Sequence, residues 1–140
     1  MTTNQTADAP SAIPAELVDL FAEPALAHIS YIGDKGQIVT FPLWVDFDGR
    51  HLVTSSPVGS KKGAAWRARP QAAVSIVSTK SPWHWLTVSG RVVDIRPDEG
   101  LLFINKMSQK YTGSAYGRNG ARETFFIEVD SVKHSGQWRG

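Results

Sequence analysis

The sequence predicts a mainly β protein with minor α content, folded as a small antiparallel barrel of six strands. Runs rich in β-branched and aromatic residues recur at hairpin spacing along the chain. The dipeptide Asp48-Gly49 between two of these runs is typical of a tight hairpin turn. Few helical segments separate the runs, and this order favours a closed or partly closed antiparallel sheet.

The N-terminal half is predicted to contain one helix and three strands. The helix covers residues 14–21, and the strands cover residues 26–32, 37–47 and 50–56. Pro14 stands in the first turn of the helix, where its missing N–H group costs nothing. Pro42 cannot donate a hydrogen bond to a neighbouring strand, so its strand must lie at a sheet edge or be bulged there. An open edge of this kind could receive a planar ligand against the backbone.

The C-terminal half is predicted to contain two helices and three strands. In order, they are a helix over residues 60–69, strands over 72–78 and 83–95, a helix over 97–111, a loop over 112–121 and a strand over 123–129. Pro70 ends the first of these helices. In the second, Phe103, Met107 and Tyr111 recur at a four-residue spacing that indicates a buried face. The acidic pair Asp98-Glu99 is expected in its first turn, where the helix dipole favours negative charge.

Length and composition indicate one domain over residues 13–140, preceded by a flexible tail at residues 1–12. The chain has 140 residues, of which 41% are hydrophobic, and no cysteine, which excludes disulfides and thiolate metal sites. The four histidines are scattered without ligand spacing, so no metal site is expected. No apolar run approaches the roughly 20 residues of a membrane helix, and no signal peptide is recognisable. A cytoplasmic location without membrane contact is expected.

Charge is distributed unevenly along the chain. Residues 49–93 contain seven Lys or Arg residues and no acidic residue, whereas the first 48 residues contain seven acidic residues and one lysine. This asymmetry predicts an anionic partner for the middle of the chain. Charge alone does not identify the anion.

Residues 54–74 concentrate the candidate binding chemistry. A strand ends at Thr54, Ser55 and Ser56, and a helix start with Lys61 and Lys62 follows a Pro/Gly turn. Backbone N–H groups, hydroxyls and lysines in this order fit a phosphate-binding turn. They also fit an exposed helix with its cations in solvent, and the charge run does not decide between the two interpretations.

Four tryptophans lie in or near this region. Trp66 falls on the short helix, and Trp44, Trp83 and Trp85 fall on predicted strands. Trp83 and Trp85 are two residues apart, so they are expected to share one strand face. Each tryptophan alone is explained by core or interface packing. Beside a phosphate-binding turn, however, their flat surfaces suit a tricyclic ring.

The order of these motifs resembles the pyridoxamine-phosphate-oxidase-like split β-barrel family of flavin and deazaflavin oxidoreductases. The similar segments are W-V-D-F-D-G, the lysine eight residues before R-P-Q-A-A-V-S-I-V, the strand ending in V-S-G-R-V and the helix I-N-K-M-S-Q-K-Y-T-G. The resemblance runs from about His28 to Val132. It implies a six-stranded split β-barrel of the FMN-binding type, which forms a homodimer and binds its cofactor at the subunit interface.

The resemblance also implies the site residues. The ring would lie against the backbone of residues 39–44, which include Thr40 and Trp44. The ribityl-phosphate region would be formed by Thr54, Ser55 and Ser56, with Lys62 on the phosphate and Lys61 as a second cation. Trp83 and Trp85 match the segment that reaches the cofactor from the partner subunit. Arg67 and Arg69 are either structural or an extension of the anion site.

The implied activity is hydride transfer between a reduced cofactor and a small conjugated organic substrate. Coenzyme F-420 is preferred over FMN because its phosphodiester and glutamate tail suit the acid-free middle of the chain. FMN is the alternative cofactor. No proton donor is identified, and Tyr111, Tyr116, His84 and His51 are candidates by residue type only.

Two other classes of function stay open from the sequence. One is a carrier that binds flavin, deazaflavin or haem without turnover. The other is a nucleic-acid-binding protein that uses the basic middle with stacked tryptophans. The modest net charge of +2 and the acidic first segment disfavour the nucleic-acid interpretation.

Overall fold

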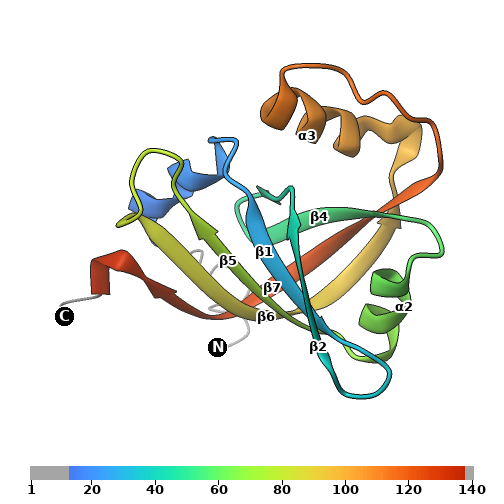
Figure 1. The fold of residues 1–140 in the computed structure, drawn as a ribbon, viewed down its shortest axis with the longest axis horizontal. Coiled ribbons are helices and arrows are strands. Elements are labelled where there is room, and N and C mark those ends of the chain that lie inside the picture. The colour runs from blue at the N-terminus through green and yellow to red at the C-terminus, as the bar shows by residue number, and fades with distance from the viewer. Residues whose placement is uncertain (1–12, 138–140) are drawn as a thin grey trace, which may run out of the picture.

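An antiparallel sheet that curls into a half-barrel forms the body of the protein (Figure 1). The computed structural model describes residues 13–137, so the tail expected at residues 1–12 lies outside the described residues, as do residues 138–140. Within the described range the sheet has seven strands, in the order β2-β1-β5-β6-β7-β4-β3. The strands are β1 (Ala27–Ile32), β2 (Ile38–Leu43), β3 (Asp46–Phe47), β4 (His51–Pro57), β5 (Gln71–Val77), β6 (Trp85–Pro97) and β7 (Arg122–His134).

Short helices lie at the rims of this sheet (Figure 1). They are η1 (Ala15–Phe21), α2 (Lys61–Ala68), η2 (Glu99–Leu101), α3 (Leu102–Thr112) and η3 (Ser135–Gln137). The prediction of a short helix before Pro70 is confirmed by α2, which begins where the Gly63 N–H donates to Ser60 Oγ at 3.0 Å. No helix within residues 13–137 is long and apolar enough to cross a lipid bilayer.

The strand predicted over residues 37–47 is broken at Trp44 and Val45, and the prediction of six strands was therefore wrong. Backbone groups at the break bond partners outside the ladder. Thr54 Oγ1 donates to the Trp44 carbonyl oxygen at 2.9 Å, and the Val45 N–H donates to the Tyr111 hydroxyl at 3.2 Å. The edge position predicted from Pro42 is confirmed, because β2 ends the described sheet and pairs with β1.

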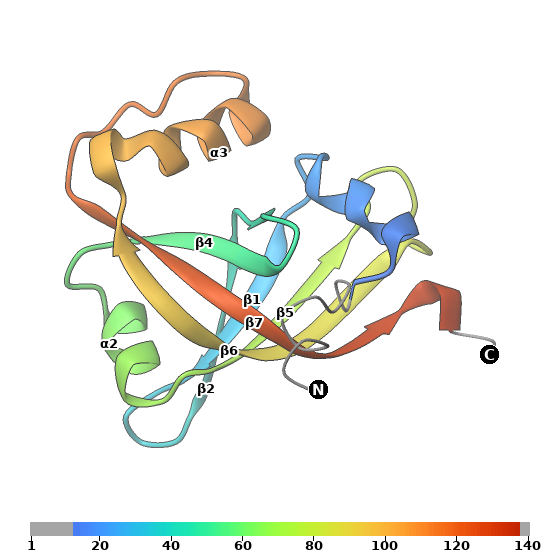
Figure 2. The same ribbon diagram turned by 180° about the vertical axis from the view of Figure 1, so that it is seen from behind.

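The long strands β6 and β7 curve together across the molecule (Figure 2). Their pairing contains two register shifts, one between Ser89 and Gly90 and one between Val92 and Asp94. Such bulges bend a strand pair and increase its twist. A side chain at Gly90 would clash with the Glu128 carbonyl oxygen, so the first bulge requires glycine. The motif V-S-G-R-V therefore marks a bend of the half-barrel.

The hydrophobic core fills the inside of the curl. Strand β5 alternates buried and exposed residues, as expected for a sheet with one face on a core. Trp66 is 1% exposed, and its ring lies 6.3 Å from that of Tyr31 and 5.3 Å from that of Phe125, centroid to centroid. Trp66 is thus a core residue and is not accessible for stacking on a nucleic-acid base.

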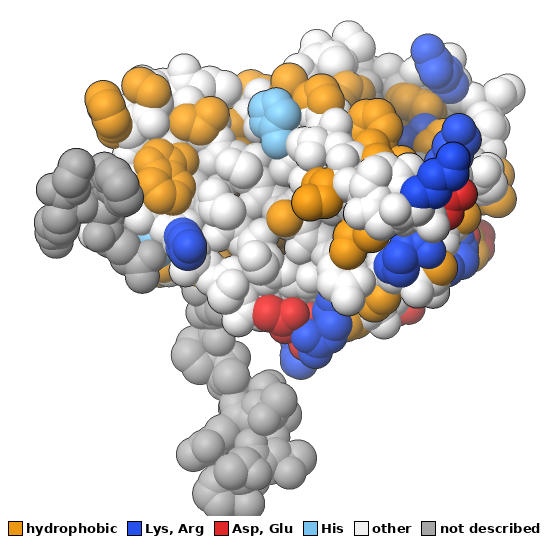
Figure 3. Space-filling model, turned by 60° about the horizontal axis from the view of Figure 1, so that its bottom comes forward, with side chains coloured by type: hydrophobic (Ala, Val, Ile, Leu, Met, Phe, Trp, Pro, Cys, Tyr) orange, Lys and Arg blue, Asp and Glu red, His pale blue; other side chains and the backbone are white. Residues whose placement is uncertain are grey.

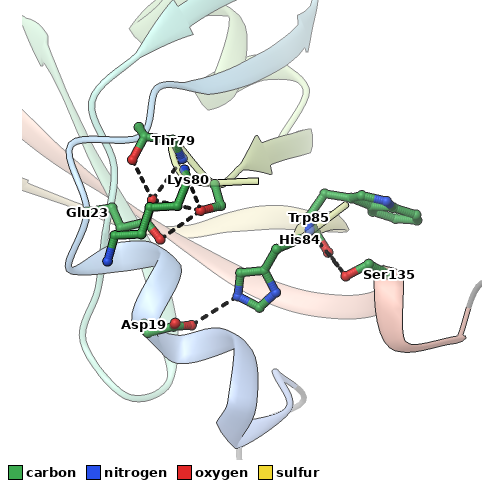
Figure 4. A network of polar contacts seen from close by, with 8 residues as sticks. Asp19, Glu23, Thr79, Lys80, His84, Trp85 and Ser135 are labelled. Carbon is green, nitrogen blue, oxygen red and sulfur yellow. Dashed lines mark hydrogen bonds and ion pairs between the residues drawn. The ribbon is translucent and has the colours of Figure 1, made fainter. Parts of the chain in front are cut away.

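A buried carboxylate ties the N-terminal helix region to the sheet (Figure 4). Glu23 is 7% exposed and accepts hydrogen bonds from Ser78 Oγ at 3.0 Å and from the Thr79 N–H and Oγ1 at 2.8 Å. Burial acts to raise the pKa of Glu23, but the hydrogen bonds and the charge of Lys80 outweigh it and leave that pKa lowered. The residues that follow β5 are therefore held against the segment after η1.

The connection between β5 and β6 is a turn, and the prediction that Trp83 lies on a strand was wrong. Strand β6 begins at Trp85, and Trp83 precedes it in the turn, so the two tryptophans do not share a strand face. His84 Nε2 lies 3.2 Å from Asp19 Oδ1 on η1, which attaches this turn to the helix (Figure 4). The contact with η1 holds the residues before Trp85 outside the strand.

Helix α3 begins at Leu102 rather than at Pro97. Gly100 and Leu101 have left-handed backbone conformations, with φ angles of 62° and 57°, which interrupt a continuous helix. The Asp98 carboxylate accepts hydrogen bonds from the N–H groups of Phe103 and Ile104 at 2.8 and 2.9 Å. Asp98 therefore caps α3 from outside instead of lying in its first turn.

Candidate functional site: a cationic pocket beside an open strand edge

A pocket of about 230 Å³ lies where β2 and β4 meet α3. The end of β2 and Trp44 form one wall, the start of β7 and the loop before it form another, and α3 covers the third side. The lining residues are Leu26, Pro42, Leu43, Trp44, Thr54, Ser55, Ile104, Met107, Tyr116 and Arg122. The pocket therefore combines apolar walls with hydroxyls and one guanidinium.

Arg122 is the cation of this pocket. Its Nε donates to Ser55 Oγ at 2.8 Å, and its Nη1 donates to the Tyr116 hydroxyl at 3.1 Å. The guanidinium also lies 5.6 Å from the centroid of the Tyr116 ring. Among the described residues, no carboxylate lies within ion-pair distance of Arg122. Its charge is thus held in place by neutral groups, and N–H donors are left for an anion.

Lys62 is a second cation next to Arg122. It extends from the first turn of α2, is 9% exposed, and its Nζ lies 3.4 Å from the Ser55 carbonyl oxygen. Burial, followed by the nearby charge of Arg122, lowers the pKa of Lys62 to about 8. No carboxylate within residues 13–137 forms an ion pair with it. Two neighbouring cations without a counter-ion favour an anionic ligand at Ser55.

The three hydroxyls predicted to form the phosphate region have different local partners. Thr54 Oγ1 bonds the Trp44 carbonyl oxygen and so fixes the end of β2. Ser56 Oγ donates to Ser60 Oγ at 2.7 Å and so supports the N-terminal cap of α2. Ser55 is the one whose hydroxyl contacts a site cation. Thr54 and Ser55 line the pocket, and Ser56 positions the helix that carries Lys62.

Strand β2 presents two of the other predicted residues in different ways. The ring of Trp44 lines the pocket and stacks on Tyr111, with centroids 5.3 Å apart and planes 7° apart. The Thr40 hydroxyl lies 3.0 Å from Ser30 Oγ and does not line this pocket. Thr40 could therefore contribute its backbone at the open edge, as the resemblance implies, but its side chain lies with Ser30.

Of the nine predicted site residues, only Trp44, Thr54 and Ser55 line the pocket of Arg122, so Lys62 lies beside the pocket and not in its wall. Three others lie farther away. Lys61 is exposed and lines a separate cavity beside α2. Trp83 is 78% exposed, and Trp85 is half-buried. Figure 1 shows the β5–β6 turn and α2 at opposite ends of the sheet. Within one chain, the structure does not bring these tryptophans to Lys62.

Comparison with known proteins gives matches among solved structures. No family model and no curated protein matches the chain. An F420 reductase shares 22% identity, with 86% of this chain and 98% of that chain covered and a TM-score of 0.78. HupZ from Group A Streptococcus shares 18% identity, with 87% and 93% covered and a TM-score of 0.62. A Listeria innocua protein named "Putative Pyridoxamine 5'-phosphate oxidase" shares 17% identity, with 78% and 86% covered and a TM-score of 0.60.

The chain has the pyridoxamine-phosphate-oxidase-like split β-barrel fold. At these identities the likeness establishes the fold alone, as a half-barrel of antiparallel strands with helices at its rims. The chemistry of the site must be argued from its own residues.

In this split β-barrel, Arg122 and Tyr116 are the site residues that sequence reasoning missed as ligand contacts. Arg122 follows a Gly-rich loop with no binding motif, and the pairing of β4 with β7 brings it to Ser55 across 67 positions. Tyr116 is held by its N–H, which donates to Asn105 Oδ1 on α3 at 3.0 Å. In the sequence, residue type is the only feature that points to them, because they are a cation and a phenol near the last strand.

The structure places the four candidate proton donors in different surroundings. The Tyr111 hydroxyl donates to the Ala25 carbonyl oxygen at 2.8 Å, and His84 pairs with Asp19. His51 Nδ1 lies 3.3 Å from Asp48 Oδ2 in the β3–β4 hairpin. Tyr116 alone among the four lines the pocket, and its hydroxyl oxygen already accepts from Arg122. Its own proton is therefore available to a ligand.

Folding neutralises part of the basic middle of the chain. Arg67 on α2 forms two hydrogen bonds with Glu123, and Arg91 pairs with Glu128 and Asp130. All three acids are on β7, beyond the acid-free stretch. Arg67 is thus structural, whereas Lys62 and Arg122 keep their charge for a ligand.

Proposed function

We propose that this protein binds a phosphate-bearing flavin or deazaflavin and acts as an oxidoreductase, with coenzyme F-420 preferred and FMN as the alternative. The observation that carries the proposal is the pair Lys62 and Arg122, which flanks Ser55 without a carboxylate partner in the described chain. This pair lies beside the open edge strand β2 of a split β-barrel. A pair of neighbouring cations of which one, Lys62, is buried is costly unless an anion compensates it.

The residues of the site fit such a cofactor. Lys62, Arg122 and the Ser55 hydroxyl would hold the phosphate, because charge-assisted hydrogen bonds to phosphate are strong. The backbone of β2 would face the ring, since an edge strand leaves alternate N–H and C=O groups unpaired. Trp44 would close the end of this surface.

The cofactor would supply the hydride-transfer chemistry once bound. The side chains of Leu26, Ile104 and Met107 would exclude water and favour an apolar, planar substrate. The Tyr116 hydroxyl could donate a hydrogen bond or a proton to that substrate, supported by Arg122. Apart from Tyr116 and Arg122, no ionisable side chain of the described chain lines the pocket.

The preference for coenzyme F-420 has two supports. The F420 reductase aligns with a TM-score of 0.78 over nearly its whole length. In addition, Lys61 and Arg69 on and after α2 form no ion pair within residues 13–137, so positive charge continues beyond the phosphate region.

We further propose a homodimer in which the partner subunit completes the site. The outer face of β1, β5 and β6 carries small uncharged side chains: Ser30, Ala73, Ser75, Thr87 and Ser89. Figure 3 shows a face of the molecule whose centre has almost no charged side chain, with Lys, Arg and acidic side chains near its margins. Such a face suits a subunit interface. The exposed Trp83 at the other end of the sheet would then reach the partner's pocket.

Calorimetric titration with FMN and with coenzyme F-420 tests the binding proposal. Lys62→Ala should weaken the affinity by about 1.5–3 kcal/mol, the scale of a hydrogen bond to a charged group. Arg50→Ala, which removes an exposed arginine from the β3–β4 hairpin, serves as the charge-matched control. Unchanged affinity in Lys62→Ala would refute the phosphate assignment. Tight binding without oxidation of the reduced cofactor by any conjugated substrate would instead indicate a carrier.

A further inference from the structure

A groove of about 350 Å³ lies between the β3–β4 hairpin and the first turns of α3. The hairpin contributes Asp46 and Asp48 to its walls, α3 contributes Leu102 and Phe103, and β7 contributes Phe126. Figure 2 shows α3 above β4 and the first part of β7. None of the residues that line the groove lines the pocket of Arg122, so the cofactor site described above does not use it.

Helix α3 divides its apolar side chains between the cofactor pocket and this groove. Ile104 and Met107 are buried and line the pocket, whereas Leu102 and Phe103 line the groove. Leu102 is 73% exposed, and the rings of Phe103 and Phe126 are half-buried. Large apolar side chains that share an exposed surface are typical of a contact with another molecule.

The same groove carries an excess of negative charge. Its lining includes four carboxylates and one lysine, so its formal charge is −3, whereas the whole chain has a net charge of +2. Within residues 13–137, no group of three or more acidic or histidine side chains could hold a metal ion. The charge of the groove therefore suits an organic cation with apolar parts better than a metal ion.

Two of the four carboxylates are open to a partner. Asp46 Oδ2 is paired with Lys106 Nζ at 2.9 Å, and Asp98 is buried and caps α3. Glu99, in contrast, is exposed and forms no ion pair in the described chain. Asp48 on the hairpin is exposed as well. Glu99 and Asp48 thus present negative charge from the helix side and from the hairpin side of the groove.

The Phe126 ring already contacts one guanidinium from its own chain. The guanidinium carbon of Arg96 lies 4.6 Å from the centroid of this ring, and Arg96 Nε donates to Asp94 Oδ2 at 2.7 Å. A guanidinium can combine these two contacts because its flat face packs on a ring while its N–H edge binds a carboxylate. The groove offers the same pair of groups in the Phe103 ring and Glu99, so arginine is the cation that suits it best.

We infer that this groove docks a segment of a partner protein that is rich in arginine and large apolar residues. Charge complementarity sets the sign of the partner, and the exposed Leu102 with the two phenylalanine rings supplies the apolar part of the contact. The inference goes beyond the proposed function and does not depend on it, because it uses no residue of the cofactor site.

The test titrates the full-length protein into the labelled, acetylated and amidated peptide Arg-Leu-Arg-Leu-Arg-Leu and follows fluorescence anisotropy. Glu99→Lys should weaken binding roughly three- to tenfold, because it replaces an attraction by a repulsion. Leu102→Ser should weaken it about threefold or more, since a leucine side chain leaves water on docking. Both side chains are exposed, so neither change should disturb folding. Asp34→Lys and Val58→Ser, at an exposed acid and an exposed apolar residue outside the groove, are the matched controls and should leave the affinity unchanged.

Two further measurements separate docking in the groove from general attraction between charges. The peptide Arg-Ser-Arg-Ser-Arg-Ser has the same charge without apolar side chains and should bind about fivefold more weakly or less. In NMR titrations, the leucine-containing peptide should shift the amide resonances of α3 and of the β3–β4 hairpin.

The inference is overturned if the leucine-containing peptide does not bind at millimolar concentration, if both peptides bind alike, or if neither groove variant weakens binding. Amide shifts confined to other parts of the protein would also overturn it. Sedimentation identifies a different occupant if the wild type self-associates and both groove variants abolish the association. The groove would then hold a second copy of this chain, and the partner-segment inference would be wrong.

Discussion

At the scale of single residues, Ser55 contacts both site cations. Its carbonyl oxygen lies 3.4 Å from Lys62 Nζ, and its hydroxyl accepts from Arg122 Nε at 2.8 Å. The two positive charges are thus brought together on one residue of β4. Since the positive charges of Lys62 and Arg122 repel each other in the free protein, a bound anion would reduce this repulsion.

This repulsion predicts that the affinity for the phosphate-bearing cofactor depends on pH. The pKa of Lys62 is lowered to about 8, first by burial and then by Arg122. Above pH 8 the free protein has a neutral Lys62, so phosphate binding must take up a proton. We expect the affinity for FMN to fall by roughly thirtyfold between pH 7 and pH 9.5, in proportion to the charged fraction of Lys62 in the free protein. Calorimetric titration across this range measures it.

The stability of the free protein should change in the opposite direction. Between pH 8 and pH 10.5 the unfolded chain holds more protons at Lys62 than the folded chain. The free energy of unfolding attributable to this lysine therefore rises with pH over that window. Lys62→Gln should remove both effects. A pH profile of binding that is unchanged in Lys62→Gln would show that another group titrates.

The sequence predicts one of the two site cations and not the other. Lys62 is found because it lies in a local pattern of strand end, turn and helix start. Arg122 is missed because its position depends on the pairing of β4 with β7, which places Pro57 opposite Arg122 and Ser55 opposite Thr124. That register is set by packing between distant segments, and no local motif encodes it.

Helix α3 is the element that forms the apolar wall of the pocket. It carries Ile104 and Met107 into the pocket, and its N-terminal N–H groups are capped by Asp98. At its other end, Lys110 Nζ donates to the Phe21 and Val45 carbonyl oxygens at 2.8 and 2.6 Å. The helix is thus fixed to the sheet by polar contacts at both ends.

Removal of the cap should destabilise the protein measurably. Asp98→Ala leaves two helix N–H groups without their carboxylate and should cost about 1 kcal/mol, or roughly 3 °C in Tm. Glu99→Ala is the matched control, because this neighbouring acid has no side-chain hydrogen bond among those described and should change stability by less than about 0.5 kcal/mol. Equal losses in thermal unfolding of the two variants would contradict the capping role.

Element boundaries were predicted less well than the elements themselves. The break at Trp44 and Val45 and the turn at Trp83 depend on contacts with segments far away in sequence, whereas the late start of α3 follows from the left-handed Gly100 and Leu101 just before it. Val45 bonds Tyr111, and His84 bonds Asp19. Local propensity favours a continuous strand at the first two places, and tertiary hydrogen bonds override it.

At the scale of the whole molecule, folding places the basic middle of the chain next to acidic residues that are distant in the sequence. The acid-free stretch and the acidic residues of β7 meet across the β4–β7 and β6–β7 pairings, so Arg67 and Arg91 become neutralised. Lys62 on α2 and Arg122 at the start of β7 keep no carboxylate partner in the described chain. The charge asymmetry of the sequence therefore supports the proposed anionic ligand only through the cations that remain after these pairs are subtracted.

The shared site makes a prediction at the scale of the dimer. If Lys62 of one subunit and Trp83 of its partner act on the same cofactor, Lys62→Ala and Trp83→Ala homodimers should both bind weakly. A mixed dimer of the two variants should behave differently, because one of its sites then carries both substitutions and the other carries neither. We expect it to show one site of wild-type affinity per dimer by calorimetry.

The control for this experiment is a mixed dimer of Lys62→Ala with Ser55→Ala, two changes expected on the same side of the site. Each of its sites keeps one substitution, so wild-type affinity should not return. Absence of restored binding in the Lys62→Ala and Trp83→Ala mixture would place Trp83 outside the partner's site. Sedimentation of the wild type as a monomer would exclude a shared site altogether, since the Trp83 turn and α2 lie at opposite ends of the sheet (Figure 1).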